Sequence, residues 1–324
     1  MFFFPVPPEE IPPEREFRTL PDADLVTLAA DTHMQIRLAH AYQLALREVF
    51  DDRNPSEHPI WRSVRLSREA PIEPQAQAIR DCLHISLDIQ CAWKDDDSAL
   101  KQWRTSIEDA GIFVFKASFK QKEISGLCLS DKEFPVIYLN NSTTKTRQIC
   151  SLLHELAHLL LSINGLSKLD QRYLDRLPAK ERNIEKYCNN LAAEVLIPSA
   201  DFAAQTRSLP DDFERLDEKV IASLATRYRV SREAILRRFL DQGRITPDLY
   251  EQQAKKWASQ NKSTGTGGDW YATKNTYLSA RFTKEVMSRH YRNQLSVEQA
   301  AELLGIKPKQ FSGIEQQVLR GSVA

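Results

Sequence analysis

The sequence predicts an α+β protein that is mainly helical, with one small three-stranded sheet and helical subdomains towards the C-terminus. Two patterns predict this class. Apolar residues recur at three- and four-residue steps through most of the 324-residue chain, as they do on one face of a helix. Between residues 112 and 139 the pattern changes to short β-branched and aromatic runs separated by polar turns, which is typical of strands.

The first part of the chain is expected to be helical after an extended start. Residues 1–20 are rich in proline and should be extended, because each proline fixes φ and removes a hydrogen-bond donor. An amphipathic helix over about 21–50 should follow a cap at Asp22. Two shorter helices are expected at 74–87 and at 98–110, the second stopped by Gly111.

The sheet and the helices after it follow in order. The elements expected from here on are strands at 112–115, 124–129 and 135–139, a helix at 144–163, a loop or lid at 164–182, a helix at 183–197, two helices within 213–240, a flexible linker at 261–269 and a helical tail to residue 324.

Composition excludes several classes of protein. Lysine plus arginine and aspartate plus glutamate both number 44, so the net charge is zero and any DNA contact must come from a local patch. The five cysteines form no CxxC pair, which argues against a disulfide framework and fits a reducing cytoplasm. No apolar run approaches the length of a membrane span, and the prolines after Met1-Phe2-Phe3-Phe4 argue against a signal peptide. We therefore expect a cytoplasmic protein without membrane contact.

One motif points to chemistry. His154-Glu155-Leu156-Ala157-His158 is an HExxH sequence inside a leucine-rich helix. Four residues correspond to about 400° of helical rotation, so the two imidazoles lie one turn apart on nearly the same face, as a shared metal ion requires. Glu155 lies one step around that face, where it can act as a general base without being a ligand. Burying three ionisable groups among leucines is costly unless a metal ion pairs with them.

A zinc ion bound by this motif needs a third protein ligand. The next helix offers Glu185 and Glu194, which are nine residues apart and therefore about half a turn out of phase, so only one can face the metal. Glu185 shares its face with Asn189, which can steady a ligand imidazole, and with the small Ala192. We favour Glu185 as the ligand, and the alternative for Glu194 is a structural salt bridge or hydrogen bond.

Other residues are candidates for supporting roles. Tyr138, Arg147, Tyr187 and His290 can each donate to an oxyanion, and the sequence does not choose among them.

A second feature is a pair of helices at 220–228 and 231–240 that resembles a helix-turn-helix. It has a local charge of +4, from the five arginines 227, 229, 232, 237 and 238 against Glu233. A solvated pair of helices is favoured over DNA contact. The segment 296–305 has a similar helix-then-turn pattern and is interpreted as a packing or partner element.

The motifs from about Gly111 to Pro198 resemble, in their order, those of the ImmA/IrrE metallopeptidases. The residues that carry this resemblance are Ile112-Phe113-Val114, Ile124-Ser125-Gly126, Val136-Ile137-Tyr138-Leu139-Asn140, Arg147, the HELAH sequence and Glu185-x-x-x-Asn189-x-x-Ala192-Ala193-Glu194-x-Leu196-Ile197-Pro198.

The resemblance implies a gluzincin-like zinc peptidase that acts on helix-turn-helix repressors in bacteria and mobile elements. It also implies that Glu185 is the third zinc ligand. Family members of similar length often carry an N-terminal helix-turn-helix domain, which we expect to be absent here and replaced by a separately encoded DNA-binding partner.

Together these observations predict a zinc endopeptidase that cleaves a helix-turn-helix repressor or similar regulator. The alternative is the effector of a toxin–antitoxin or phage-defence pair, which is held by a helix-turn-helix antitoxin and works by binding. In both cases the sheet packs on the HExxH helix and the second ligand helix. The expected units are an N-terminal proline-rich segment and scaffold helix (1–70), the zinc metallopeptidase domain (71–205), a helix-turn-helix-like subdomain (206–260), the linker (261–269) and a C-terminal helical tail (270–324).

Overall fold

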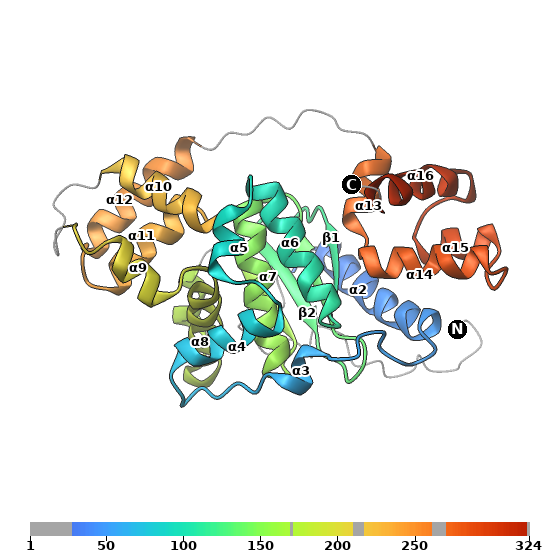
Figure 1. Cartoon of the computed structure of the whole chain (residues 1–324), viewed down its shortest axis with the longest axis horizontal. Helices are drawn as coiled ribbons and strands as arrows, with labels where there is room; N and C mark the ends of the chain where they lie inside the picture. Colours follow the sequence, from blue (N-terminus) through green and yellow to red (C-terminus); the bar gives the residue numbers. More distant parts are fainter. Residues whose placement is uncertain (1–27, 169–170, 210–216, 261–269, 323–324) are drawn as a thin grey trace.

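The structure is a computed structural model that describes residues 28–168, 171–209, 217–260 and 270–322. It is mainly helical with one small sheet, so the predicted α+β class is confirmed (Figure 1). The predicted extended segment at 1–20 and the predicted linker at 261–269 lie outside the described residues.

The sheet has four strands in the order β1-β3-β2-β4, one more than predicted. β1 (Phe113–Ala117) runs parallel to β3 (Val136–Asn140), and β2 (Ile124–Leu129) is antiparallel to both β3 and β4 (Gly165–Lys168). The unpredicted strand, β4, lies in the segment expected to be a loop. It has only one large apolar residue in four, so its sequence lacks the periodic signal of a strand.

The sheet separates two hydrophobic cores. On one face Val114, Ile137 and Leu139 pack with the helices that surround the HExxH motif. On the other face Phe115 and Tyr138 pack with α2 and the C-terminal helices. Successive side chains of a strand point to opposite faces, and here both faces are buried, which is why the strands show no polar alternation.

Between residue 28 and the sheet the structure has five helices: α2 (Ala30–Val49), α3 (Ile60–Ser63), α4 (Ile72–Cys82), α5 (Leu87–Ala92) and α6 (Asp96–Asp109). Helix α2 begins at Ala30, after the extended Ala29, and the cap expected at Asp22 lies outside the described residues. The single helix expected at 74–87 is wrong. His84 adopts a positive φ of 55°, which ends the helical path after α4, and Ser86 then caps α5 by accepting a hydrogen bond from the Ile89 amide.

Two helices carry the predicted site, and two groups of helices follow on either side of them (Figure 1). The site helices are α7 (Lys145–Leu160) and α8 (Ala179–Leu196), joined by β4 and the 3₁₀ helix η2 (Gln171–Arg176). The first group is α9 (Ser199–Gln205), α10 (Glu218–Tyr228), α11 (Arg232–Asp241) and α12 (Pro247–Gln260). The second is α13 (Trp270–Tyr277), α14 (Ala280–Tyr291), α15 (Val297–Leu303), η3 (Pro308–Gln310) and α16 (Phe311–Ser322).

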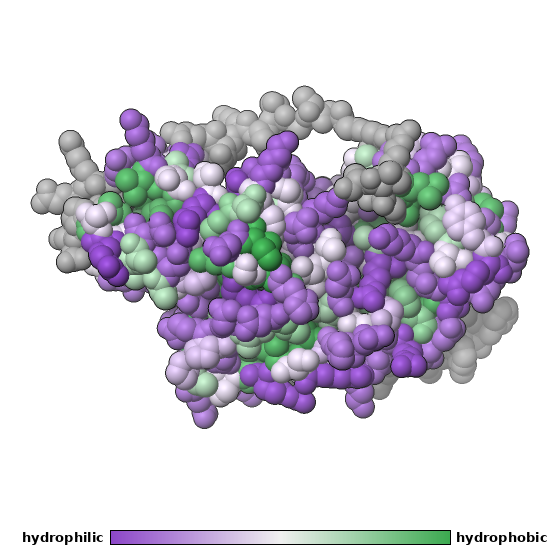
Figure 2. All heavy atoms as spheres, in the orientation of Figure 1, coloured by the Kyte–Doolittle hydropathy of each residue, from purple (hydrophilic) through white to green (hydrophobic). Residues whose placement is uncertain are grey.

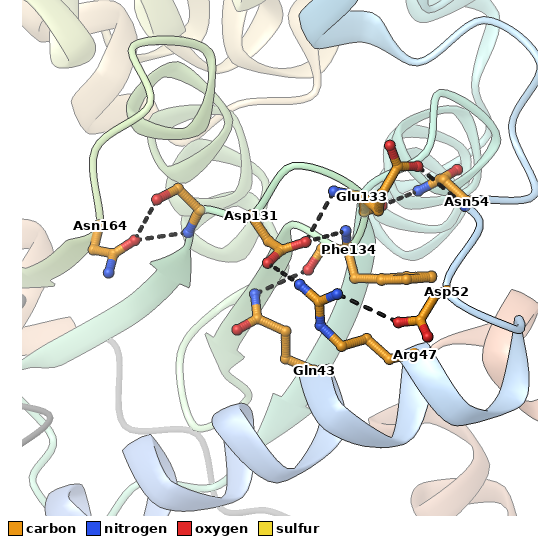
Figure 3. Close-up of polar contacts among 9 residues, drawn as sticks. Gln43, Arg47, Asp52, Asn54, Asp131, Glu133, Phe134 and Asn164 are labelled. Atoms are coloured by element: carbon orange, nitrogen blue, oxygen red, sulfur yellow. Dashed lines mark hydrogen bonds and ion pairs between the residues drawn. The ribbon is translucent and has the colours of Figure 1, made fainter.

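Helix α2 is attached to the turn between β2 and β3 by polar contacts (Figure 3). Arg47 pairs with Asp131 at 2.5 Å, and the amide of Gln43 donates to the carbonyl of Phe134 at 2.9 Å. The other oxygen of Asp131 accepts the backbone amides of Glu133 and Phe134, both at 2.8 Å. The turn and the helix therefore hold each other in place on the outer face of the sheet.

The second group of helices is fixed to the sheet by a buried ion pair. Arg104 on α6 lies 3.5 Å from Glu108 and donates to the carbonyl oxygens of Val114, Thr276 and Leu278. Glu108 in turn accepts the amides that begin α14. The α13–α14 junction is therefore tied directly to α6 and β1.

The visible surface is mostly hydrophilic, with smaller hydrophobic areas between the polar ones (Figure 2). Among the described helices, none combines the length and the apolar character that crossing a bilayer requires.

Replacing Arg104 by alanine should lower the free energy of unfolding by about 3–5 kcal/mol, because it leaves the Glu108 carboxylate buried without its cation. Urea denaturation measures this change. As a control, Arg62→Ala removes an arginine that is 58% exposed and pairs with Glu133, and it should cost no more than about 1 kcal/mol. Equal destabilisation by the two variants would contradict the anchoring role of Arg104.

Candidate metal centre

Polar residues at the end of β3 and just after it cap the N-terminus of helix α7. Asn140 accepts hydrogen bonds from the amide and hydroxyl of Ser142, and the Thr144 side chain accepts the amide of Arg147. From this cap the helix runs into the core between β2, α6 and α8. His154, Glu155 and His158 are consequently buried, with exposed fractions of 6%, 0% and 0%.

The structure brings the two histidines and Glu185 together. Their imidazole Nε2 atoms lie 3.0 Å apart, and the two oxygens of Glu185 lie 3.3 Å from His154 Nε2 and 3.2 Å from His158 Nε2. Around a tetrahedral zinc ion, N and O ligand atoms are about 3.3 Å apart. The three side chains thus form a group of metal-ligand geometry, and all of its candidate ligand atoms lie within 4.8 Å of one another.

The charges at this site also fit a cation. Glu185 is fully buried, and although burial alone raises the pKa of its carboxyl group, the two imidazoles outweigh that effect and lower the pKa. Glu155 is buried as well, and neither of its carboxylate oxygens accepts from an N–H or O–H group among the described residues. The thiol of Cys128, a weak donor, lies beside it, and burial together with Glu155 raises the pKa of that thiol. Two buried carboxylates beside two imidazoles leave excess negative charge that a divalent metal ion would offset.

Strand β4 closes one side of the site. Helix α7 ends near Ser162, whose φ is 58°, and the chain returns along β2. A Cβ atom on Gly165 would lie 2.9 Å from Oε2 of Glu155 and 3.0 Å from the ring of His158. Glycine therefore lets the strand pass close to the two side chains without displacing them.

Tyr173 is a site residue that the sequence analysis missed. It lies on η2, and its buried hydroxyl donates to Oε2 of Glu185 at 2.9 Å. Burial and the neighbouring Glu185 and Glu155 raise its pKa well above the ordinary value, so the hydroxyl keeps its proton. It lies in the segment interpreted as a loop or lid, where no periodicity distinguishes it. Instead, Tyr173, Leu174 and Leu177 are buried in the outer core.

The supporting residues named from the sequence separate into two groups. Asn189 and Arg147 line the same pocket as His154, and Arg147 also forms a 3.5 Å ion pair with Glu233. Glu194 faces away from the metal group. Its oxygens accept from the amide and hydroxyl of Ser199 and from Arg238.

The remaining donor candidates lie elsewhere. Tyr138 is on the outer face of the sheet, where its hydroxyl donates to Gln35 at 3.0 Å. Tyr187 donates to Gln75. His290 lies on α14, where its Nδ1 atom is 3.0 Å from the carbonyl oxygen of Leu295. Tyr138 was expected near the site because the sequence does not reveal which face of a doubly buried strand meets α7.

The arginines of α10 and α11 mostly make internal contacts. Arg227 forms a two-point contact with Asp201, Arg238 pairs with Glu194 at 2.6 Å, and the guanidinium of Arg232 lies over the ring of Trp257. The Arg238 contact attaches the α9–α12 group to α8, and the other two contacts hold the helices of the group together.

Glu185→Gln should abolish stoichiometric binding of zinc, because a neutral amide is a much weaker ligand than a carboxylate. Glu194→Gln is the matched control on the same helix, and it should keep one zinc ion per chain while losing stability. Metal analysis of the two purified variants beside the wild type measures the difference. Zinc loss in the Glu194 variant alone would refute the ligand assignment.

Tyr173→Phe should weaken zinc affinity by about 10- to 100-fold, since it removes the hydrogen bond that orients a ligand carboxylate. Tyr187→Phe deletes a hydroxyl from a nearby helix position and should leave the affinity unchanged. Competition with a fluorescent chelator gives both affinities. If the two variants bind zinc alike, Tyr173 has no role at the metal.

The sequence was compared with known proteins. No curated protein matches the chain. Residues 107–240 match a family described as the IrrE N-terminal-like domain, Peptidase_M78. The matched segment starts in α6 and ends in α11, so it contains the sheet, both site helices and the group formed by His154, His158 and Glu185. Residues 107–240 are therefore similar to the IrrE N-terminal-like domain, and this similarity points to a metallopeptidase-like function.

Proposed function

We propose that this protein is a zinc-dependent endopeptidase that acts in the cytoplasm on a helix-turn-helix repressor or a similar regulator. The observation that carries the hydrolytic part is the buried His154, His158 and Glu185 group beside a second carboxylate, Glu155, that accepts from no described N–H or O–H group. The IrrE-like family match supports a peptidase. The choice of a repressor as substrate rests on the resemblance of the sequence motifs to the ImmA/IrrE peptidases.

The donor set favours zinc. Two imidazoles and one carboxylate form a common three-ligand set of catalytic zinc, which leaves one position for water or substrate. Bound there, zinc acts as a Lewis acid and lowers the pKa of water.

Glu155 has the position and the freedom to move protons in the reaction. In peptide hydrolysis, water adds its oxygen to the carbonyl carbon, and the bond from that carbon to nitrogen breaks. Glu155 takes one proton from the water and gives it to the departing nitrogen. Its carboxylate is suited to this because no described N–H or O–H group occupies its oxygens.

Other side chains position the reacting groups. Tyr173 orients Glu185 through its hydrogen bond, and Asn189 lies beside His154 in the pocket, where it can steady the ring. Arg147 lies at the mouth of the pocket beside Ser151 and Lys168 and can donate to a substrate carbonyl. This pocket, which opens onto His154, is the route by which substrate would reach the site.

Glu155→Gln should keep one zinc ion per chain and slow cleavage of a fluorescence-quenched peptide library by about 10²- to 10⁴-fold, because the general base is lost. Metal analysis and cleavage rates measure the two effects. Glu194→Gln, which changes a buried glutamate outside the site, controls for the loss of a charge. If wild type and Glu155→Gln turn over peptides at the same rate, the protein works by binding and the hydrolase proposal fails.

A further inference from the structure

The C-terminal helices are basic in a neutral chain. Residues 270–324 contain eight lysines and arginines and four glutamates, a net charge of +4, so residues 1–269 have a net charge of −4. A local excess of positive charge is expected where a protein of zero net charge contacts a polyanion.

Helices α15 and α16 are joined in the manner of a helix-turn-helix. Ser296 begins α15 with a capping box, and Gly305 follows its end with a φ of 62°, a left-handed conformation that glycine adopts without strain. Pro308 then starts η3, which continues into α16. A short helix, a turn with a glycine and a second helix define this motif.

The motif has a packed interior. Ala300 and Ala301 are fully buried on α15, and their small side chains allow close contact with the second helix. Leu304, Phe311 and Ile314 are buried in the same core, together with Phe282, Val286 and Met287 of α14. The position of α16 relative to α15 is therefore fixed, as the recognition helix of a helix-turn-helix requires.

The outer face of the second helix is exposed and has the chemistry of a DNA contact. Lys309, Ser312, Gln316 and Leu319 are spaced by three, four and three residues, so they share one face, and all four are exposed. Lys307 is exposed just before the helix. Lysine neutralises phosphates, glutamine and serine bond base edges, and an aliphatic chain can contact the thymine methyl group.

No acidic residue is among the described residues that form this face. Glu315 is the one acidic residue between positions 307 and 320, and it accepts a hydrogen bond from the hydroxyl of Tyr291. Glu298 and Glu302 are exposed on α15, so phosphate contact is expected along α16 and η3 instead of along the outer side of α15. In Figure 2 the surface over α14 and α15 is largely hydrophilic.

We propose that α15, η3 and α16 form a helix-turn-helix that binds duplex DNA through the face formed by Lys307, Lys309, Ser312 and Gln316. This activity is separate from peptide hydrolysis, since none of these residues belongs to the metal centre. It places DNA contact at the C-terminal helices and not at α10 and α11, whose arginines Arg227, Arg232 and Arg238 are engaged in contacts within the protein.

The test uses the full chain and a fluorescein-labelled 30-base-pair duplex of mixed sequence, with binding followed by anisotropy at several salt concentrations. We expect a Kd of about 10⁻⁶–10⁻⁴ M near physiological salt and tighter binding at lower salt. Lys307→Glu with Lys309→Glu should weaken binding at least tenfold. Lys307→Ala with Lys309→Ala should reduce the slope of log K against log salt by about 2, or about 1 for each phosphate that is no longer neutralised.

The matched control reverses two exposed lysines outside the motif, Lys101 on α6 and Lys284 on α14, and so makes the same change in net charge. It should bind DNA as the wild type does. Lack of DNA binding by the wild type up to about 100 µM at low salt would overturn the proposal. So would equally weakened binding by the control, or undiminished binding by the Lys307 and Lys309 variants. Zinc content, which the proposal expects to stay constant, separates this result from a failure of the metal centre.

Discussion

The structure of the candidate metal centre depends on the burial of two carboxylates, Glu155 and Glu185, beside the imidazoles of His154 and His158. In an interior of low polarity such charges are tolerated only when a cation or hydrogen bonds compensate them. Glu185 has Tyr173 and the imidazoles, whereas Glu155 accepts from no described N–H or O–H group. This difference in hydrogen-bond partners fits two roles, in which Glu185 is held in place as a metal ligand and Glu155 stays free to exchange a proton.

Much of this site could be predicted because helix geometry is regular. The spacing of His154 and His158 places both rings on one face, and the nine-residue separation of Glu185 and Glu194 puts the latter out of phase. The structure indeed turns Glu194 towards Ser199 and Arg238. Phase along a helix is a local property, so one sequence is enough to derive it.

The parts that could not be predicted depend on contacts between distant segments. Tyr173 reaches Glu185 from a short 3₁₀ helix that has no periodic pattern. Residues 165–168 form strand β4 because they pair with the edge strand β2, and their own sequence does not favour a strand. Tyr138 was misplaced since both faces of β3 are buried, and residue types alone do not distinguish the side that meets α7 from the side that meets α2.

Gly165 lies where strand β4 passes Glu155 and His158, and a Cβ atom there would lie 2.9 Å from Oε2 of Glu155. A larger residue at this position, seven residues downstream of His158, would have to displace Glu155 or the ring of His158. Among candidate homologues that retain both histidines, a bulkier residue at the equivalent point would mark a chain whose edge strand has shifted or whose hydrolytic centre has been lost. The residue at this position therefore reports whether the edge strand and the candidate metal centre can keep their present arrangement.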